Sequence, residues 1–101
     1  MTDQQDTTDT LRQYQQALRQ HKEGAALKLE AQLFKNGLDA QLCGKRILLT
    51  HHQDQLARIK SKGAINGNIE VYAENLFTTQ HRIQLVAEQI DQLEKRIGGR
   101  K

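Results

Sequence analysis

The chain has 101 residues, a formal net charge of +3, no proline and only 4% aromatic residues. This length allows a single domain. β-Sandwiches and barrels need turn-forming residues and β-branched or aromatic strands, which are scarce here. Glutamine, alanine, leucine, lysine and glutamate dominate instead, and all of them favour helices. We therefore expect an all-α protein whose buried surface runs along its helices rather than filling one large core.

Cysteine content and hydropathy bear on the cellular compartment. The single cysteine, Cys43, cannot form an internal disulfide, which fits a reducing compartment. No apolar run approaches the roughly 20 residues of a membrane span, and the polar first ten residues do not resemble a signal peptide. We expect a cytoplasmic protein without a membrane partner.

The N-terminal segment divides into a tail and a helix. Residues 1–9 are polar and carry three aspartates, so we expect a mobile acidic tail. Thr10 and Gln13 fit a capping box, in which each side chain satisfies a free backbone N–H group, so a helix should begin near Thr10. Residues 10–98 are then expected to form one helical domain, followed by a basic tail at 99–101.

Two apolar stripes follow from residue 27 onward and lie on different sides of the same predicted helix. A helix with two apolar faces has more than one neighbour. Gly37 and Gly44 each cost about 1 kcal/mol in a helix interior. The stripe through Phe34, Leu38, Leu42 and Leu49 keeps its phase across both glycines, so we predict a continuous helix. Whether the chain bends near Gly24 is left open; if it does, Tyr14 would lie near Leu33.

The last third of the chain, residues 65–97, carries apolar residues at alternating spacings of four and three, interrupted only at Thr79. This period of 3.5 is typical of a helix with a narrow seam that packs against a partner helix. Lys62 and Gly63 favour a turn, expected at 61–67, and either Asn66 or Asn68 could cap the next helix. The predicted hairpin seam comprises Leu27, Phe34, Leu38, Leu42, Leu49, Leu56, Ile59, Ile65, Ile69, Leu76, Ile83, Val86, Ile90, Leu93 and Ile97.

Folding the chain at Lys62 brings the stripe that runs through Phe34, Leu38 and Leu42 into register with the apolar seam of residues 65–97, as an antiparallel, coiled-coil-like hairpin. Leu38 then faces Val86, and Phe34 faces Ile90. The polar interruptions also pair, because His52 faces Tyr72 and Lys45 faces Thr79. The predicted fold is therefore an antiparallel helical hairpin with an N-terminal helical extension, which becomes a three-helix bundle if the first helix folds back.

This hairpin leaves further apolar residues on its outside, and repeated outward apolar residues predict association. They could be covered by the folded-back N-terminal segment, by a second copy or by a different protein. The predicted partner-binding face comprises Leu29, Leu33, Ile47, Val71, Phe77 and Leu85.

The sequence contains little that indicates a reaction. His51 and His52 are adjacent, so their side chains point about 100° apart on a helix and cannot easily share a metal ion. His81 falls level with Cys43, but two ligands do not make a site. We find no paired-carboxylate pocket, glycine-rich phosphate loop or nucleophile triad. We predict no catalytic residue, metal, cofactor or small-molecule substrate.

Basic residues cluster at the expected hairpin tip and at the C-terminus. Either cluster could neutralise phosphates, although no aromatic residue is interleaved with them. Alternatively, these basic residues keep the protein soluble and interact favourably with the helix dipoles at the C-termini of the helices. If the protein binds nucleic acid, the predicted contact residues are Arg58, Lys60, Lys62, Arg96, Arg100 and Lys101.

The turn Gly63-Ala64-Ile65-Asn66-Gly67-Asn68-Ile69, followed by an amphipathic helix ending Gln92-Leu93-Glu94, resembles the bend and second arm of small helical-hairpin proteins encoded by bacteriophages. The resemblance covers the latter half of the chain and implies an assembly or virion setting, with no functional residues carried over. We therefore expect a non-enzymatic interaction module, a scaffold, adaptor or accessory subunit that self-associates or docks onto a larger assembly. The alternative is a small basic nucleic-acid-binding protein.

Overall fold

The computed structural model describes residues 3–99, and their side chains from Thr7 onward. Within this part the chain forms four α-helices: α1 (Asp3–Arg19), α2 (Glu23–Lys35), α3 (Leu38–Lys62) and α4 (Ile69–Gly99). A short 3-10 helix, η1 (Ile65–Gly67), lies between the last two. The described residues contain no β-strand, which confirms the expected all-α class.

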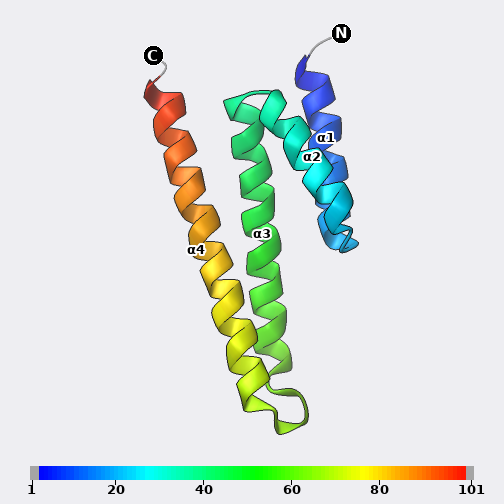
Figure 1. Cartoon of the computed structure of the whole chain (residues 1–101), viewed down its shortest axis with the longest axis vertical. Coiled ribbons are helices and arrows are strands. Elements are labelled where there is room, and N and C mark those ends of the chain that lie inside the picture. Colours follow the sequence, from blue (N-terminus) through cyan, green and yellow to red (C-terminus); the bar gives the residue numbers. More distant parts are fainter. Residues whose placement is uncertain (1–2, 100–101) are drawn as a thin grey trace.

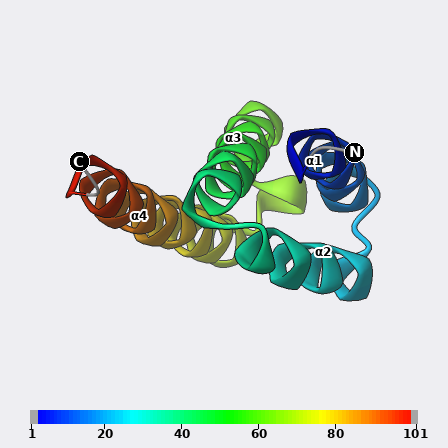
Figure 2. The same cartoon turned by 90° about the horizontal axis from the view of Figure 1, so that it is seen from above.

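The helices run alternately down and up the long axis of the molecule (Figure 1), whose extents are 54 × 28 × 18 Å. α3 and α4 form an antiparallel hairpin. α1 and α2 form a second, shorter hairpin that packs against the N-terminal half of α3, on the side away from α4 (Figure 2). The predicted helical hairpin with an N-terminal helical extension is confirmed, and the extension itself consists of two helices.

The first helix begins earlier than predicted, and the structure decides where it ends, which the sequence left open. α1 begins at Asp3 instead of Thr10, so residues 3–9 are helical, and residues 1–2 lie outside the described part. Asn36 Nδ2 donates a hydrogen bond of 3.3 Å to Thr7 Oγ1, which joins the start of α1 to the end of α2. α1 ends at Arg19, and the chain reverses through His21, whose φ of 58° lies in the left-handed region. The bend near Gly24 therefore exists, slightly earlier in the chain.

Gly37 separates α2 from α3, so the predicted continuous helix through this position is wrong. Gly37 has φ 108° and ψ −179°, a backbone conformation open essentially to glycine alone. Gly44, in contrast, lies inside α3 as predicted and is buried. A Cβ built on Gly44 would lie 2.8 Å from Leu33 Cδ1, so the glycine permits α2 and α3 to approach closely. The break at Gly37 therefore lets α2 fold back and pack against α3.

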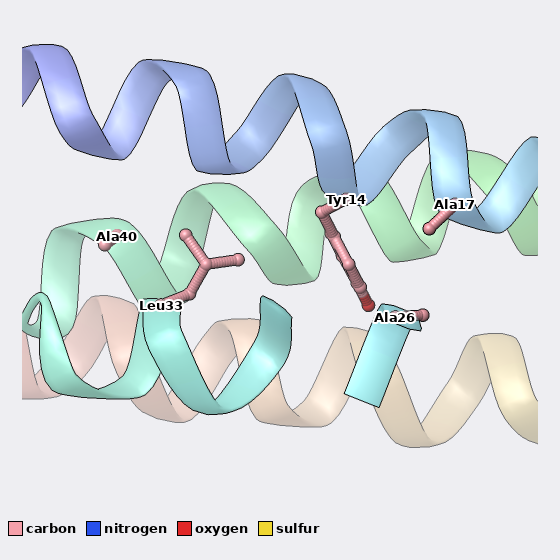
Figure 3. Packing of buried hydrophobic residues seen from close by; sticks show 5 residues of the cluster. All are labelled: Tyr14, Ala17, Ala26, Leu33 and Ala40. Carbon is pink, nitrogen blue, oxygen red and sulfur yellow. The ribbon is translucent and has the colours of Figure 1, made fainter. Parts of the chain in front are cut away.

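The core lies where α1, α2 and α3 meet, and Figure 3 shows its buried members. Tyr14 extends from α1 toward Ala26 of α2, and Leu33 fills the space between α2 and Ala40. Tyr14 and Leu33 are 1% and 2% exposed, and each stabilises the fold by about 1.5–3 kcal/mol through its buried apolar surface. The small partners allow close helix packing. Leu11, Leu18, Leu29, Ile47 and Leu48 pack around this cluster.

The α3–α4 turn is fixed by backbone and side-chain hydrogen bonds. Gly63, with φ 66°, donates its N–H to the Ile59 carbonyl at 3.0 Å and ends α3. Asn68 Oδ1 accepts the Val71 N–H at 3.2 Å, which makes Asn68 the N-cap of α4. The inward face of α4 then follows a heptad pattern, and its buried residues are Thr79, Val86, Ile90 and Leu93.

The register of this hairpin differs from the one predicted with Lys62 as the pivot. That pivot would place Arg46 opposite Thr78, with Glu94 roughly 24 Å farther along α4 at 1.5 Å per residue. Arg46 instead forms an ion pair of 2.9 Å with Glu94. Because η1 lengthens the turn, α4 begins only at Ile69, and pairs such as Leu38 with Val86 are displaced along the helix.

Candidate interaction surfaces

An apolar groove of about 450 Å³ lies between α2 and α3. Tyr14, Leu33 and Gly44 contribute the buried part of its lining. Leu27 and Phe34 of α2 also line it, although they are 65% and 69% exposed. Lys35, Gln41 and Lys45 add polar groups to the same groove. The groove is therefore apolar at its base and open to solvent along α2.

Leu27, Ala31 and Phe34 form a stripe along α2, which we call the α2 seam. The sequence placed Leu27 and Phe34 in the hairpin seam, but the break at Gly37 removes α2 from that hairpin. The remaining predicted seam residues occupy different places. Val86, Ile90 and Leu93 are buried, Ile65 and Ile69 are exposed at the hairpin tip, and eight are half-buried: Leu38, Leu42, Leu49, Leu56, Ile59, Leu76, Ile83 and Ile97.

Charges of opposite sign flank the α2 seam. The spacings of four and three make its residues successive d, a and d positions of a heptad. Glu23 and Glu30 then occupy g positions on one side, and Lys28 and Lys35 occupy e positions on the other. Glu30 Oε1 accepts a hydrogen bond from the Tyr14 hydroxyl, and its other carboxylate oxygen, Oε2, could accept from a cationic side chain of a partner. The α2 seam thus has one acidic and one basic edge.

The predicted partner-binding face divides into a covered and an exposed part. Leu29, Leu33 and Ile47 belong to the core or pack against it, because α1 folds back over them. On the outer side of α4, Val71, Phe77 and Leu85 are 49%, 72% and 45% exposed. The Phe77 ring stacks on His81, with centroids 6.4 Å apart and an interplanar angle of 1°.

The hairpin tip carries a second hollow, of about 530 Å³, lined by Ile59, Lys62, Ile65 and Tyr72 among others. Lys60 and Lys62 are exposed in the last turn of α3. Arg96 is exposed in the last turn of α4, at the opposite end of the molecule. Arg100 and Lys101, also predicted to contact nucleic acid, lie outside the described residues.

A polar pocket of about 190 Å³ lies between the end of α1 and the middle of α3. It brings together Arg19, His21, His51 and Arg58, which sequence reasoning left unconnected. The rings of His21 and His51 have centroids 6.4 Å apart, in an edge-to-face arrangement. Burial lowers the pKa of His51, and the positive charges of His52, His21 and Arg58 lower it further. The sequence left open whether the chain folds back near Gly24. That fold-back is the feature from which this pocket could have been expected, because it brings the end of α1 beside α3.

The same geometry bears on metal ligation and membrane insertion. Among the side chains that the structure describes, no group of three or more His, Cys, Asp or Glu could hold a metal ion. Cys43 is a free, exposed thiol on α3. No helix between residues 3 and 99 combines the length and apolarity needed to cross a bilayer.

Comparison with known proteins gives no assignment. The chain matches no protein-family model, no curated protein and no solved structure. Its function must therefore be inferred from its own surfaces.

Proposed function

We propose that this protein is a non-enzymatic helical assembly module that self-associates through α2. The observation that supports the proposal most strongly is the α2 seam, an apolar stripe with heptad spacing and no partner helix within the described chain. Leu27 and Phe34 are large side chains, and neither belongs to the core. An exposed apolar stripe beside a groove is typical of a surface that packs on another helix.

The flanking charges favour a second copy of this chain, packed with its α2 parallel to the first. In a parallel pair, a g residue faces the e residue of the next heptad on the other helix. Glu23 would then face Lys28 of the second copy, and Glu30 would face Lys35. An antiparallel pair would instead set Glu against Glu and Lys against Lys, which is repulsive.

The structure of the single chain also reduces the cost of association. An isolated helix of 13 residues is marginal in water. Here α2 is already ordered by Leu33, Ala26 and the Tyr14–Glu30 hydrogen bond, so little ordering entropy is lost on binding. A symmetric pair covers two copies of Leu27 and of Phe34. Full burial of such a side chain contributes about 1.5–3 kcal/mol.

The first test is the mass of the purified protein, measured by light scattering. Self-association predicts about twice the chain mass of 11.6 kDa at micromolar concentration. Phe34→Asp should give a monomer of unchanged helicity, because Phe34 is exposed in the single chain. Phe77→Asp is the matched control, since Phe77 is equally exposed but lies on α4, and it should remain a dimer. A monomeric wild-type protein would refute the proposal, as would a dimer that only Phe77→Asp disrupts.

A charge exchange tests the parallel orientation. In a parallel homodimer, Lys28→Glu sets Glu23 against a second carboxylate, and Glu23→Lys sets two ammonium groups against each other. Each variant alone should therefore be mostly monomeric. In an equimolar mixture of the two variants, the carboxylates of one variant face the ammonium groups of the other, so the mixture should form a heterodimer. If the mixture stays monomeric while the wild type is a dimer, the parallel arrangement is wrong.

Nucleic-acid binding is the second candidate function. The observation that favours it is the convergence of Arg19 from α1 with Arg58 of α3, on a helix whose last turn exposes Lys60 and Lys62. A basic surface that neutralises phosphates binds with an affinity that falls steeply with salt. The wild-type protein should be retained on a DNA column at low salt. A triple variant with Arg58→Gln, Lys60→Gln and Lys62→Gln should lose this retention if the function is correct. No retention at low salt removes it.

A further inference from the structure

The polar pocket between α1 and α3 has the composition of an anion site. Arg19 and Arg58 approach it from two different helices, and His21 and His51 add two imidazole rings. Thr50, Gln15 and Gln55 supply neutral hydrogen-bond donors to the same lining. The pocket's volume of about 190 Å³ is enough for one tetrahedral anion with several waters, each of which occupies about 30 Å³ in the liquid.

The guanidinium groups of this pocket lack an ion-pair partner among the described side chains. Neither Arg19 nor Arg58 forms an ion pair with any of the side chains described from Thr7 to Gly99. Asp54 is the only carboxylate among the described residues that line the pocket. Two guanidinium groups and two imidazoles thus share one acidic neighbour.

Basic groups also outnumber acidic groups among the residues around His51 when all the neighbouring elements are counted. His52, Asp54 and Arg58 lie on α3 itself, and Arg19, His21 and Lys22 come from α1 and the turn that follows it. α2 contributes Glu23 and α4 contributes Arg82. Cationic and titratable basic groups therefore outnumber the two carboxylates, and each histidine that gains a proton adds to the excess.

The backbone of the turn holds His21 in place for this role. His21 has φ 58°, which is uncommon for a residue other than glycine and is tolerated by histidine better than by most. Three backbone hydrogen bonds fix the turn, from the N–H groups of Gln20, His21 and Lys22 to carbonyls of α1, at 2.9–3.2 Å. Strained backbone of this kind is concentrated at functional sites.

We propose that this pocket binds a tetrahedral oxyanion, the sulfate or phosphate type of group, between the guanidinium groups of Arg19 and Arg58. His21 and His51 add charged donors when they are protonated. The proposal is independent of self-association, because none of these residues belongs to the α2 seam.

The pH dependence of binding follows from the same charges. In the empty pocket, burial and the neighbouring cations hold the pKa of His51 below its ordinary value of 6.5. A bound anion reverses the electrostatic part of this effect, so binding and proton uptake favour each other. The affinity should therefore increase as the pH falls from 8 to 6.

Sulfate is the probe, because it keeps its double negative charge throughout this pH range. Sulfate should be titrated into the full chain at constant ionic strength, following the imidazole Cε1–H signals by NMR. We expect saturable shifts of His21 and His51, with a dissociation constant at least tenfold lower at pH 6 than at pH 8. Arg19→Gln and Arg58→Gln should each weaken binding at least fivefold. Lys60→Gln, a neutralisation two residues from Arg58 and outside the pocket, should change it less than twofold.

Two further titrations distinguish a free phosphate from a nucleic-acid phosphodiester. Inorganic phosphate and a ten-residue oligothymidylate should each be added to the wild type and to Arg58→Gln. If phosphate and the oligonucleotide both bind, and Arg58→Gln weakens the binding of each, the ligand is a phosphodiester. If only phosphate binds, the ligand is a small free oxyanion. The proposal is overturned if sulfate causes no saturable shift of His51, or if Lys60→Gln weakens binding as much as Arg58→Gln.

Discussion

The hydroxyl of Tyr14 donates a 2.5 Å hydrogen bond to Oε1 of Glu30 and so joins α1 to α2. Tyr14 is 1% exposed, the most deeply buried large side chain among the described residues. Its phenol ring belongs to the core, while its hydroxyl reaches the carboxylate beside the α2–α3 groove. One residue therefore both packs the N-terminal hairpin and fixes an acidic group of the α2 seam.

Removal of this hydroxyl should destabilise the protein. Tyr14→Phe keeps the ring but loses a hydrogen bond to a charged group, which is expected to lower the free energy of unfolding by about 1.5–3 kcal/mol. Urea denaturation followed by circular dichroism measures this change. Tyr72→Phe, at a half-buried position of α4 with no hydrogen bond from its hydroxyl among the described residues, should change stability by less than about 0.5 kcal/mol, the usual range for such sites.

The same residue predicts a loss of stability at alkaline pH. Burial, followed by the hydrogen bond to and the charge of Glu30, raises the pKa of Tyr14 above its ordinary value of 10.0. Above pH 10 the unfolded chain loses this proton while the folded chain retains it, so the free energy of unfolding falls as the pH rises. Denaturation curves between pH 8 and 11 should show a steeper fall for the wild type than for Tyr14→Phe. Equal slopes would contradict the assignment.

Gly37 should tolerate no side chain without strain. With φ 108°, Gly37→Ala forces an alanine into a conformation that costs about 1–3 kcal/mol, and thermal or urea denaturation should show this loss. Gly24→Ala provides the comparison, because Gly24 lies in the first turn of α2 with open space around it. That substitution should be neutral or stabilise the protein by up to about 1 kcal/mol. A stabilised Gly37→Ala variant would indicate that α2 and α3 can form one helix.

The inward face of α4 can be tested with one pair of aspartates. Leu76 is half-buried and Gln80 is exposed, four residues farther along the same helix. Leu76→Asp places a charge in the α3–α4 seam and should unfold the protein or lower its stability by several kcal/mol. Gln80→Asp should be nearly silent. Equal losses in both variants would show that the seam has been assigned to the wrong face.

His51 predicts a decrease in stability on mild acidification in chloride buffer. Because its folded-state pKa lies below the ordinary value of 6.5, the unfolded chain binds a proton that the folded chain does not as the pH falls below that value. The free energy of unfolding should therefore decrease from about pH 6.5 downward. His51→Gln should flatten this dependence, whereas His81→Gln, on the outer face of α4, should leave it intact. Denaturation curves at pH 5, 6 and 7 test the difference.

Much of the fold can be predicted from the sequence. Absence of proline, few aromatic residues and the 3.5-residue period from Tyr72 to Ile97 are local properties, and they suffice for an all-α chain with a long C-terminal helix. The turn at Gly63 and the cap at Asn68 are also local, because each depends on the backbone preference or hydrogen bonding of a few neighbours.

The position of α2 was not decided locally. A stripe that keeps its phase across Gly37 fits a continuous helix as well as it fits two helices. The chain breaks at Gly37 because the break lets α2 pack against α3, with Leu33 lying on Gly44, a contact that one continuous helix cannot make. The register of α3 on α4, which the Arg46–Glu94 ion pair reports, likewise involves the path of the chain through η1, and periodicity does not reveal that path.

The sequence by itself therefore determined the all-α class, the long C-terminal helix, the hairpin turn and which face of α4 is apolar, because helix periodicity and capping act over a few residues. Only the tertiary structure decided which apolar stripe stays exposed and which basic groups meet. It left the α2 seam uncovered and brought Arg19 and His21 to His51 and Arg58, because burial and electrostatics depend on distances in space rather than along the chain.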